Sequence, residues 1–186
     1  MQNKHGIAVA NIDFSKAFDC VSHDKLLARF AQYGVCGTLL LWLQRFFSDR
    51  THQTRIGTSL SSVANLLSGV VQFIGPIAFI IYINHLVKLI EQSGIHVKVF
   101  ADDMVYIELY DVQCTAKLQD VLNLWAADWQ LEISVTKTNI LNIGSTEHAV
   151  DYYMCNTVLL VVTTCHDLGI TDTNDLAPSQ HINDNC

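Results

Sequence analysis

VKVFADDMVYI, residues 97–107, is the stretch of this 186-residue chain on which its interpretation depends. Apolar side chains alternate with other residues on both sides of two adjacent carboxylates, Asp102 and Asp103. An alternation of period two predicts two short strands, and the few residues between them predict a hairpin turn. The two carboxylates are therefore expected at the tip of a hairpin, where neighbouring side chains point to opposite faces.

Two adjacent acids at such a tip have two interpretations. Mg²⁺ takes oxygen ligands in octahedral geometry and leaves part of its shell to water and substrate phosphates, so the pair suits this cation if a third carboxylate lies nearby. Alternatively, the pair is solvated, because Asp is a common turn residue. The hairpin alone leaves both interpretations open.

The composition is that of a folded domain, with half of the residues apolar and 16% charged. The net charge is −7, from 11 basic and 18 acidic residues. A duplex-binding domain normally carries a Lys/Arg-rich surface, because neutralising phosphates supplies most of its non-specific affinity. If the chain handles nucleic acid, we expect the basic surfaces in other segments, or weak binding.

The cysteines and the most apolar stretch indicate the compartment. Six cysteines are scattered without a CxxC pair, and the N-terminus lacks a long apolar signal core, so we expect an intracellular protein, nuclear or cytoplasmic. Residues 70–83 are strongly apolar but are interrupted by Gln72, Gly75 and Pro76. This stretch is too short to span a bilayer, so we expect a buried helix and no membrane partner.

Hydrophobic periodicity predicts strands and helices along most of the chain. Strands are expected at 6–14, 54–56, 63–67, 138–143, 158–162 and 168–170, and helices at 22–33, 39–47, 77–90 and 113–130. Distant strands with helices between them indicate an α/β or α+β sheet layered on helices. Residues 171–186 offer little to bury and are expected to form a disordered tail.

Asp13 closes the first apolar strand, 89 residues before Asp102. An acid in this position is either a helix N-cap or a metal ligand. The separation from Asp102 forbids a local motif but permits a shared site in the fold. Three such carboxylates also fit a Mg²⁺-dependent nuclease or phosphatase.

Several short segments of the chain form an ordered set. They are IDFSKAFDCVSH, LLLWLQRFFSDR, LLSGV with the following Gln72 and Gly75-Pro76, IYIN, FADD, the Trp125/Trp129 helix, Lys137-Thr138 and HDLGI. This set resembles the palm of reverse transcriptases from non-LTR (LINE-type) retrotransposons, from about Ile7 to Ile170. The resemblance implies an α+β palm over residues 6–170, with an antiparallel sheet, helices packed on one face, and fingers and thumb largely missing.

In that family, the Asp of the first motif and the paired Asp of the FADD box hold two Mg²⁺ ions, for which Mn²⁺ can substitute. The resemblance therefore implies Asp13, Asp102 and Asp103 as metal ligands, with RNA template, DNA primer and dNTPs as partners. Two metals about 3.5–4 Å apart activate the primer 3′-hydroxyl and stabilise the leaving pyrophosphate. Lys137 corresponds to a family lysine that acts as general acid, although a lysine before a strand is also commonly just solvated.

Phe18 stands where the family places an aromatic ring against C2′ of the nucleotide sugar. A ring there leaves no room for a 2′-hydroxyl and favours dNTPs over rNTPs; the alternative is ordinary helix packing. Further members of the same motifs complete the implied substrate-binding set. They are Phe14, Ser68, Gly69, Gln72 and Ala101.

The segment 68–76 departs from the family pattern. It lacks a Pro and a Gly-Ser and is two residues short, and Phe73 replaces a glycine that permits close backbone approach. His85 replaces a family Asp, and Ser134 an Asn. We therefore expect a truncated, weakly active or inactive polymerase; the alternative is a non-enzymatic remnant that serves as a binding or scaffold module and self-associates through an exposed apolar palm surface.

Overall fold

The computed structural model describes residues 7–71, 73–100, 104–109, 112–144, 151–154, 156–167 and 170–177. In chain order the elements are β1 (Ile7–Ile12), α1 (His23–Gln32), α2 (Gly37–Phe47), β2 (Thr51–His52), β3 (Arg55–Ile56), β4 (Ser59–Leu60), β5 (Ala64–Asn65), α3 (Gly75–Gln92), β6 (His96–Phe100), β7 (Met104–Leu109), α4 (Val112–Trp129), β8 (Asn139–Ile143), β9 (Tyr153–Met154), β10 (Thr157–Val158), β11 (Leu160–Val162), β12 (Thr164–Asp167) and β13 (Ile170–Thr173). The α+β class predicted from the sequence is confirmed.

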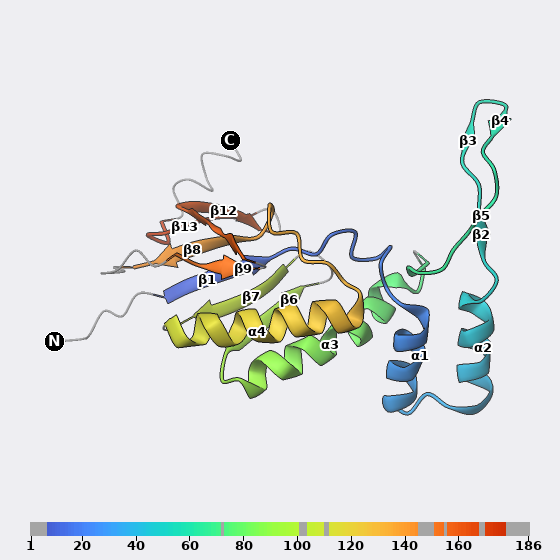
Figure 1. Ribbon diagram of the computed structural model, residues 1–186, viewed down its shortest axis with the longest axis horizontal. Coiled ribbons are helices and arrows are strands. Elements are labelled where there is room, and N and C mark those ends of the chain that lie inside the picture. Colours follow the sequence, from blue (N-terminus) through green and yellow to red (C-terminus); the bar gives the residue numbers. More distant parts are fainter. Residues whose placement is uncertain are drawn as a thin grey trace.

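A five-stranded sheet in the order β11-β8-β1-β7-β6 forms the centre of the fold (Figure 1). The first strand, β1, lies in the middle and pairs antiparallel with β7 and with β8. β11 departs from the expected antiparallel pattern, because it pairs parallel with β8. The chain between these strands reverses direction once more through the β9–β10 hairpin, and a parallel pair needs such a long connection.

The predicted hairpin of residues 97–107 is confirmed. β6 pairs antiparallel with β7 in a register that ends with Phe100 opposite Met104. Residues 101–103, which join the two strands, lie outside the described part of the chain.

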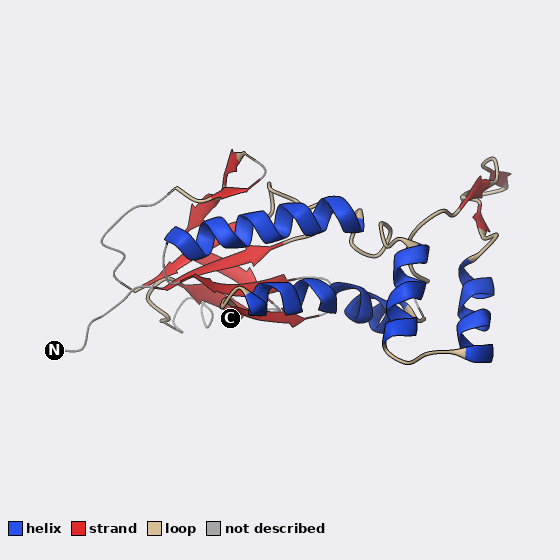
Figure 2. Ribbon diagram, turned by 60° about the horizontal axis from the view of Figure 1, so that its bottom comes forward, coloured by secondary structure: helices blue, strands red, loops and turns tan. Residues whose placement is uncertain are grey.

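The two faces of the sheet are covered differently. On β1, Ala8, Ala10 and Ile12 are buried in the main hydrophobic core, which also contains the buried residues of α3 and α4. Both views show α3 and α4 side by side along one face of the sheet, with α1 and α2 beyond its end (Figure 1, Figure 2). The expected packing of helices on one face is therefore confirmed. On the opposite face, Val9 packs with Leu141 and with Cys165 of β12.

The C-terminal tail predicted from Thr171 does not begin there. β13 continues to Thr173 and pairs antiparallel with β12. Thr171 and Thr173 are buried, at 4% and 6% exposed, because alternate residues of a strand point to the same face. The sequence prediction relied on a lack of apolar residues, and this strand turns threonines inward instead.

Two strongly apolar helices, α2 and α3, leave some of their large apolar side chains exposed. In α2, Leu43 and Phe47 are buried, whereas Trp42 is 52% exposed. In α3, which was expected to be buried all round, Ile77 and Ile80 are 63% and 52% exposed. Each of these helices is covered on one side only by the described elements, so its outer apolar residues face solvent.

The segment between α2 and α3 forms a narrow arm that projects beyond α2 (Figure 1). Its base is the antiparallel pair β2 and β5, and its tip is the antiparallel pair β3 and β4. The sequence predicted two strands here, at 54–56 and 63–67; the structure has four shorter ones. Across the described residues, no helix combines the length and apolarity that crossing a membrane requires.

Candidate functional site

Asp13 follows directly on β1, in the middle of the sheet. The register places Ile12 opposite Val105 of β7, so the next position along β7 is Met104, its first residue. Ala101, Asp102 and Asp103 immediately precede Met104 in the chain, and they lie outside the described residues. The C-terminal end of β1 and the start of β7 therefore lie side by side. The contact of Asp13 with Asp102 and Asp103 stays a prediction.

The main chain around Asp13 is held by the segment that precedes β8. The Ser134 N–H donates to the Asp13 carbonyl oxygen at 2.8 Å, and the Asp13 N–H donates to Thr138 Oγ1 at 3.3 Å. One step further, the Ser15 N–H donates to the Glu132 carbonyl oxygen at 2.8 Å. The backbone of Asp13 is thus fixed on both sides by hydrogen bonds.

The carboxylate of Asp13 has an oxygen available for a cation. Its Oδ1 is buried and accepts no hydrogen bond within the described residues, while the Lys137 ammonium lies 3.5 Å away. Buried polar atoms normally have a hydrogen-bond partner, whereas among the described residues this oxygen has only the ion pair with the exposed Lys137 ammonium. Because Mg²⁺ prefers such oxygens, the side chain fits a metal ligand.

The two predicted aromatic residues lie in different environments. Phe14 is 6% exposed, and its ring lies 6.1 Å from that of Trp125, so its side chain packs in the core and its role in substrate binding stays a prediction. Phe18 is half-buried, and its ring lies 5.2 Å from that of Phe79. One side of the Phe18 ring is therefore packed, and the remainder is accessible.

Ser68 and Gly69 hold the loop that carries Phe18. Ser68 Oγ donates to the Asp19 carbonyl oxygen at 2.8 Å, and the Gly69 N–H donates to the Val21 carbonyl oxygen at 2.8 Å. Gly69 has φ +91°, and a Cβ there would lie 3.0 Å from the Asp19 carbonyl oxygen. The glycine thus permits a close approach between the backbone of this loop and that of the loop that carries Phe18. The role of Gly69 in substrate binding stays a prediction.

The next residues of this loop are Val70, Gln72 and Phe73. The Val70 N–H donates to the Phe18 carbonyl oxygen at 2.9 Å, so the shortened segment still anchors to the Phe18 loop. Phe73 is 97% exposed. Gln72 lies outside the described residues.

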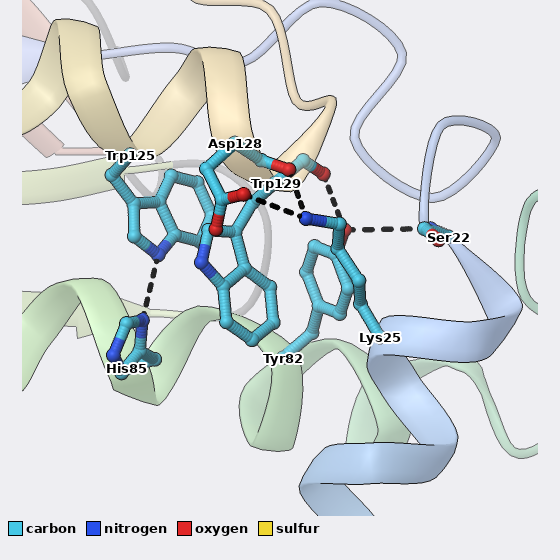
Figure 3. A network of polar contacts seen from close by, with 7 residues as sticks. All are labelled: Ser22, Lys25, Tyr82, His85, Trp125, Asp128 and Trp129. Carbon is cyan, nitrogen blue, oxygen red and sulfur yellow. Dashed lines mark hydrogen bonds and ion pairs between the residues drawn. The ribbon is translucent and has the colours of Figure 1, made fainter.

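A network of polar contacts, partly buried and partly exposed, supports this loop from the side of the helices (Figure 3). The Tyr82 hydroxyl accepts the Ser22 N–H at 3.4 Å and donates to the Trp129 carbonyl oxygen. Burial raises the pKa of Tyr82 to about 12, so its hydroxyl stays protonated. Lys25 forms an ion pair with Asp128 at 3.0 Å. These contacts tie the start of α1 to α3 and α4.

Residues 1–171 match the family reverse transcriptase (RNA-dependent DNA polymerase). The chain belongs to the reverse transcriptase family. Comparison with curated proteins finds no match.

The fold of this reverse transcriptase family member is also similar to a solved structure. Apo telomerase from Candida tropicalis, truncated from the C-terminal domain, superimposes with a TM-score of 0.67 at 12% sequence identity. The match covers 95% of this chain and 36% of that one, so the chain spans little more than a third of the telomerase length. At this identity, the likeness shows the fold alone.

Two contacts of the candidate site were not predicted from the sequence. Thr138 was noted only as part of Lys137-Thr138 and as the start of a strand, yet it accepts the Asp13 N–H. Tyr82 was included only in the IYIN segment, yet it bridges α1 and α4. The one sequence signal that could have indicated this contact of Thr138 was the position of its hydroxyl, between an exposed turn and an apolar strand.

Proposed function

We propose that the chain is the palm of an RNA-directed DNA polymerase, which transfers nucleotides from dNTPs to the 3′-hydroxyl of a DNA primer on an RNA template. The observation that carries this proposal is the Asp13 carboxylate at the end of the central strand, next to the start of β7, with a buried oxygen that accepts no hydrogen bond in the described structure. The ordered motifs support a non-LTR retrotransposon as the origin of the chain.

Asp13, Asp102 and Asp103 are the residues that would hold two Mg²⁺ or Mn²⁺ ions. When bound, these ions supply an activated 3′-hydroxyl and a neutralised leaving pyrophosphate. Asp13 presents its carboxylate from a backbone fixed by Ser134 and Thr138. We propose that Lys137, whose exposed ammonium lies 3.5 Å from this carboxylate, donates a proton to the pyrophosphate.

The sugar selectivity of the proposed polymerase rests on Phe18. Its ring is backed by Phe79, with the two ring centroids 5.2 Å apart, so the Phe18 ring is supported on that side. A ring held in this way rejects a 2′-hydroxyl by steric exclusion. We therefore infer a preference for dNTPs over rNTPs.

The departures in residues 68–76 support weak activity. Phe73 is almost fully exposed, and it stands where the family has a glycine that permits close backbone approach. We propose that the chain by itself extends primers weakly or not at all, while the carboxylates still bind metal.

Metal binding therefore gives the decisive experiment. Titration with Mn²⁺, followed by electron paramagnetic resonance of the free ion, should show sites that are lost in Asp13→Asn and in Asp102→Asn. Asp19→Asn, an exposed acid in the same loop, is the matched control and should bind as wild type does. Equal Mn²⁺ binding by wild type and both site variants would overturn the proposal. Primer extension with dNTPs then separates an active polymerase from an inactive one.

A second candidate function is a non-enzymatic scaffold. Leu67 and Phe73 are 85% and 97% exposed, and exposed apolar side chains promote association when they form a contiguous surface. This candidate predicts concentration-dependent oligomers on size-exclusion chromatography and no Asp13-dependent Mn²⁺ binding. A monomer at all concentrations would count against it.

A further inference from the structure

The strand that carries Asp13 changes its pairing at that residue. Asn11 lies opposite Asn139 of β8, whereas Phe14 forms an isolated antiparallel bridge with Ile133. Five residues, 134–138, therefore stand opposite only two, Ile12 and Asp13. The three extra residues form a bulge in the strand that faces Asp13. Bulges next to active sites commonly re-aim a side chain.

The bulge is closed by its own hydrogen bonds. The N–H groups of Lys137 and Thr138 both donate to the Ser134 carbonyl oxygen, at 3.1 and 2.9 Å. This turn is what places the Ser134 N–H against the Asp13 carbonyl oxygen and Thr138 Oγ1 against the Asp13 N–H. A regular antiparallel ladder would not need a side chain to accept the N–H of the facing strand.

Thr138 is 1% exposed, whereas Thr136 in the same bulge is exposed. A buried position before an apolar strand is more simply filled by valine, which has the same shape as threonine without the hydroxyl. The Thr138 hydroxyl accepts a hydrogen bond from the backbone N–H of Asp13, and a valine side chain could not accept it.

We propose that the bulge of residues 134–138 is a positioning element for the Asp13 carboxylate, with the Thr138 hydroxyl as its deciding group. Through the main chain it fixes where Asp13 presents its oxygens to a divalent cation. The inference rests on the proposed function, because it takes Asp13 as a metal ligand. Groups that hydrogen-bond to a metal ligand and orient it strongly affect metal affinity. Their removal typically lowers that affinity by about 10–100-fold.

The test compares Thr138→Val, which keeps shape and loses the hydroxyl, with Thr138→Ser, which keeps the hydroxyl. Thr136→Val is the matched control in the same bulge. We expect Thr138→Val to bind Mn²⁺ about tenfold more weakly, at the low end of that range because the contact is to the main chain. Thr138→Ser and Thr136→Val should bind as wild type does. Urea unfolding shows which variants are folded, and Thr138→Ala replaces Thr138→Val if the latter is not.

A second measurement needs no metal. Hydrogen exchange of the Asp13 amide, followed by NMR, should be slow in wild type and Thr138→Ser and faster in Thr138→Val. Unchanged Mn²⁺ affinity in Thr138→Val, with binding still lost in Asp13→Asn, would overturn this inference and leave the proposed function standing. If Asp13→Asn bound Mn²⁺ as tightly as wild type does, both this inference and the proposed function would be overturned.

Discussion

The indole N–H of Trp125 donates to Nδ1 of His85 at 3.2 Å, and this bond joins α4 to α3 (Figure 3). The His85 ring also lies 4.9 Å from the ring of Trp129. In the sequence, His85 replaces a family Asp and is one of the changes that predict a weakly active or inactive polymerase. In the structure, the imidazole supplies an acceptor for a buried donor, as a carboxylate could.

Replacement of His85 by leucine should therefore destabilise the fold. The Trp125 N–H would lose its acceptor while Trp125 stays 2% exposed, and an unsatisfied buried donor costs about 1–3 kcal/mol. His85→Asp should cost less, because it keeps an acceptor. Urea unfolding measures both free energies, with His52→Leu on the exposed arm as the control. Equal stability of His85→Leu and wild type would show that this bond contributes nothing.

The same contact predicts a pH dependence of stability. Burial, with the nearby Arg29 and Lys88 charges, lowers the pKa of His85 below its usual 6.5, although Asp128 opposes the shift. Below pH 6.5 the unfolded chain binds a proton that the folded chain does not, so the free energy of unfolding falls as the pH decreases. We expect wild type to lose more stability between pH 7.5 and 5.5 than His85→Asn. Parallel curves for the two proteins would contradict this assignment.

Local sequence patterns were sufficient to predict much of the fold. The β6–β7 hairpin and the helices followed from periodicity, because a side chain's face is set by its own strand or helix. Phe14 shows a signal that was available and not used: it shares the inward face of β1 with Ile12 by simple alternation, so its burial follows from the sequence. Motif membership gave it a substrate role instead.

Contacts between distant segments were not predictable in this way. The bond from Asp13 to Thr138 spans 125 residues and exists because a bulge shifts the register by three residues. No local pattern encodes where a strand changes partners. The burial of Thr171 likewise depends on its pairing with His166 of β12, and the exposure of Trp42 depends on which elements cover α2.

Gly69 allows a sharp test of the contact between the shortened loop and the loop of Phe18. Gly69→Ala places a Cβ 3.0–3.1 Å from backbone atoms of Phe18 and Asp19, whereas Gly34, with a similar φ of +87°, faces open space. Both substitutions incur the strain of a left-handed conformation, about 1–2 kcal/mol. Gly69→Ala should cost more than Gly34→Ala by at least about 1 kcal/mol, because rigid backbone must move. Thermal unfolding of the two variants makes the comparison, and equal losses would refute the close approach.

Lys137 and a divalent cation compete for the same carboxylate oxygen of Asp13. The ammonium lies 3.5 Å from Oδ1 and is 69% exposed, so the ion pair is worth at most about 1 kcal/mol. Lys137→Met should therefore bind Mn²⁺ more tightly, by up to about fivefold, the opposite direction from Thr138→Val one residue away. The gain should shrink at high salt, where exposed charges are screened. Lys117→Met, on the exposed side of α4, is the control. If Lys137→Met binds Mn²⁺ more weakly than wild type, Lys137 supports the metal site rather than competing with it.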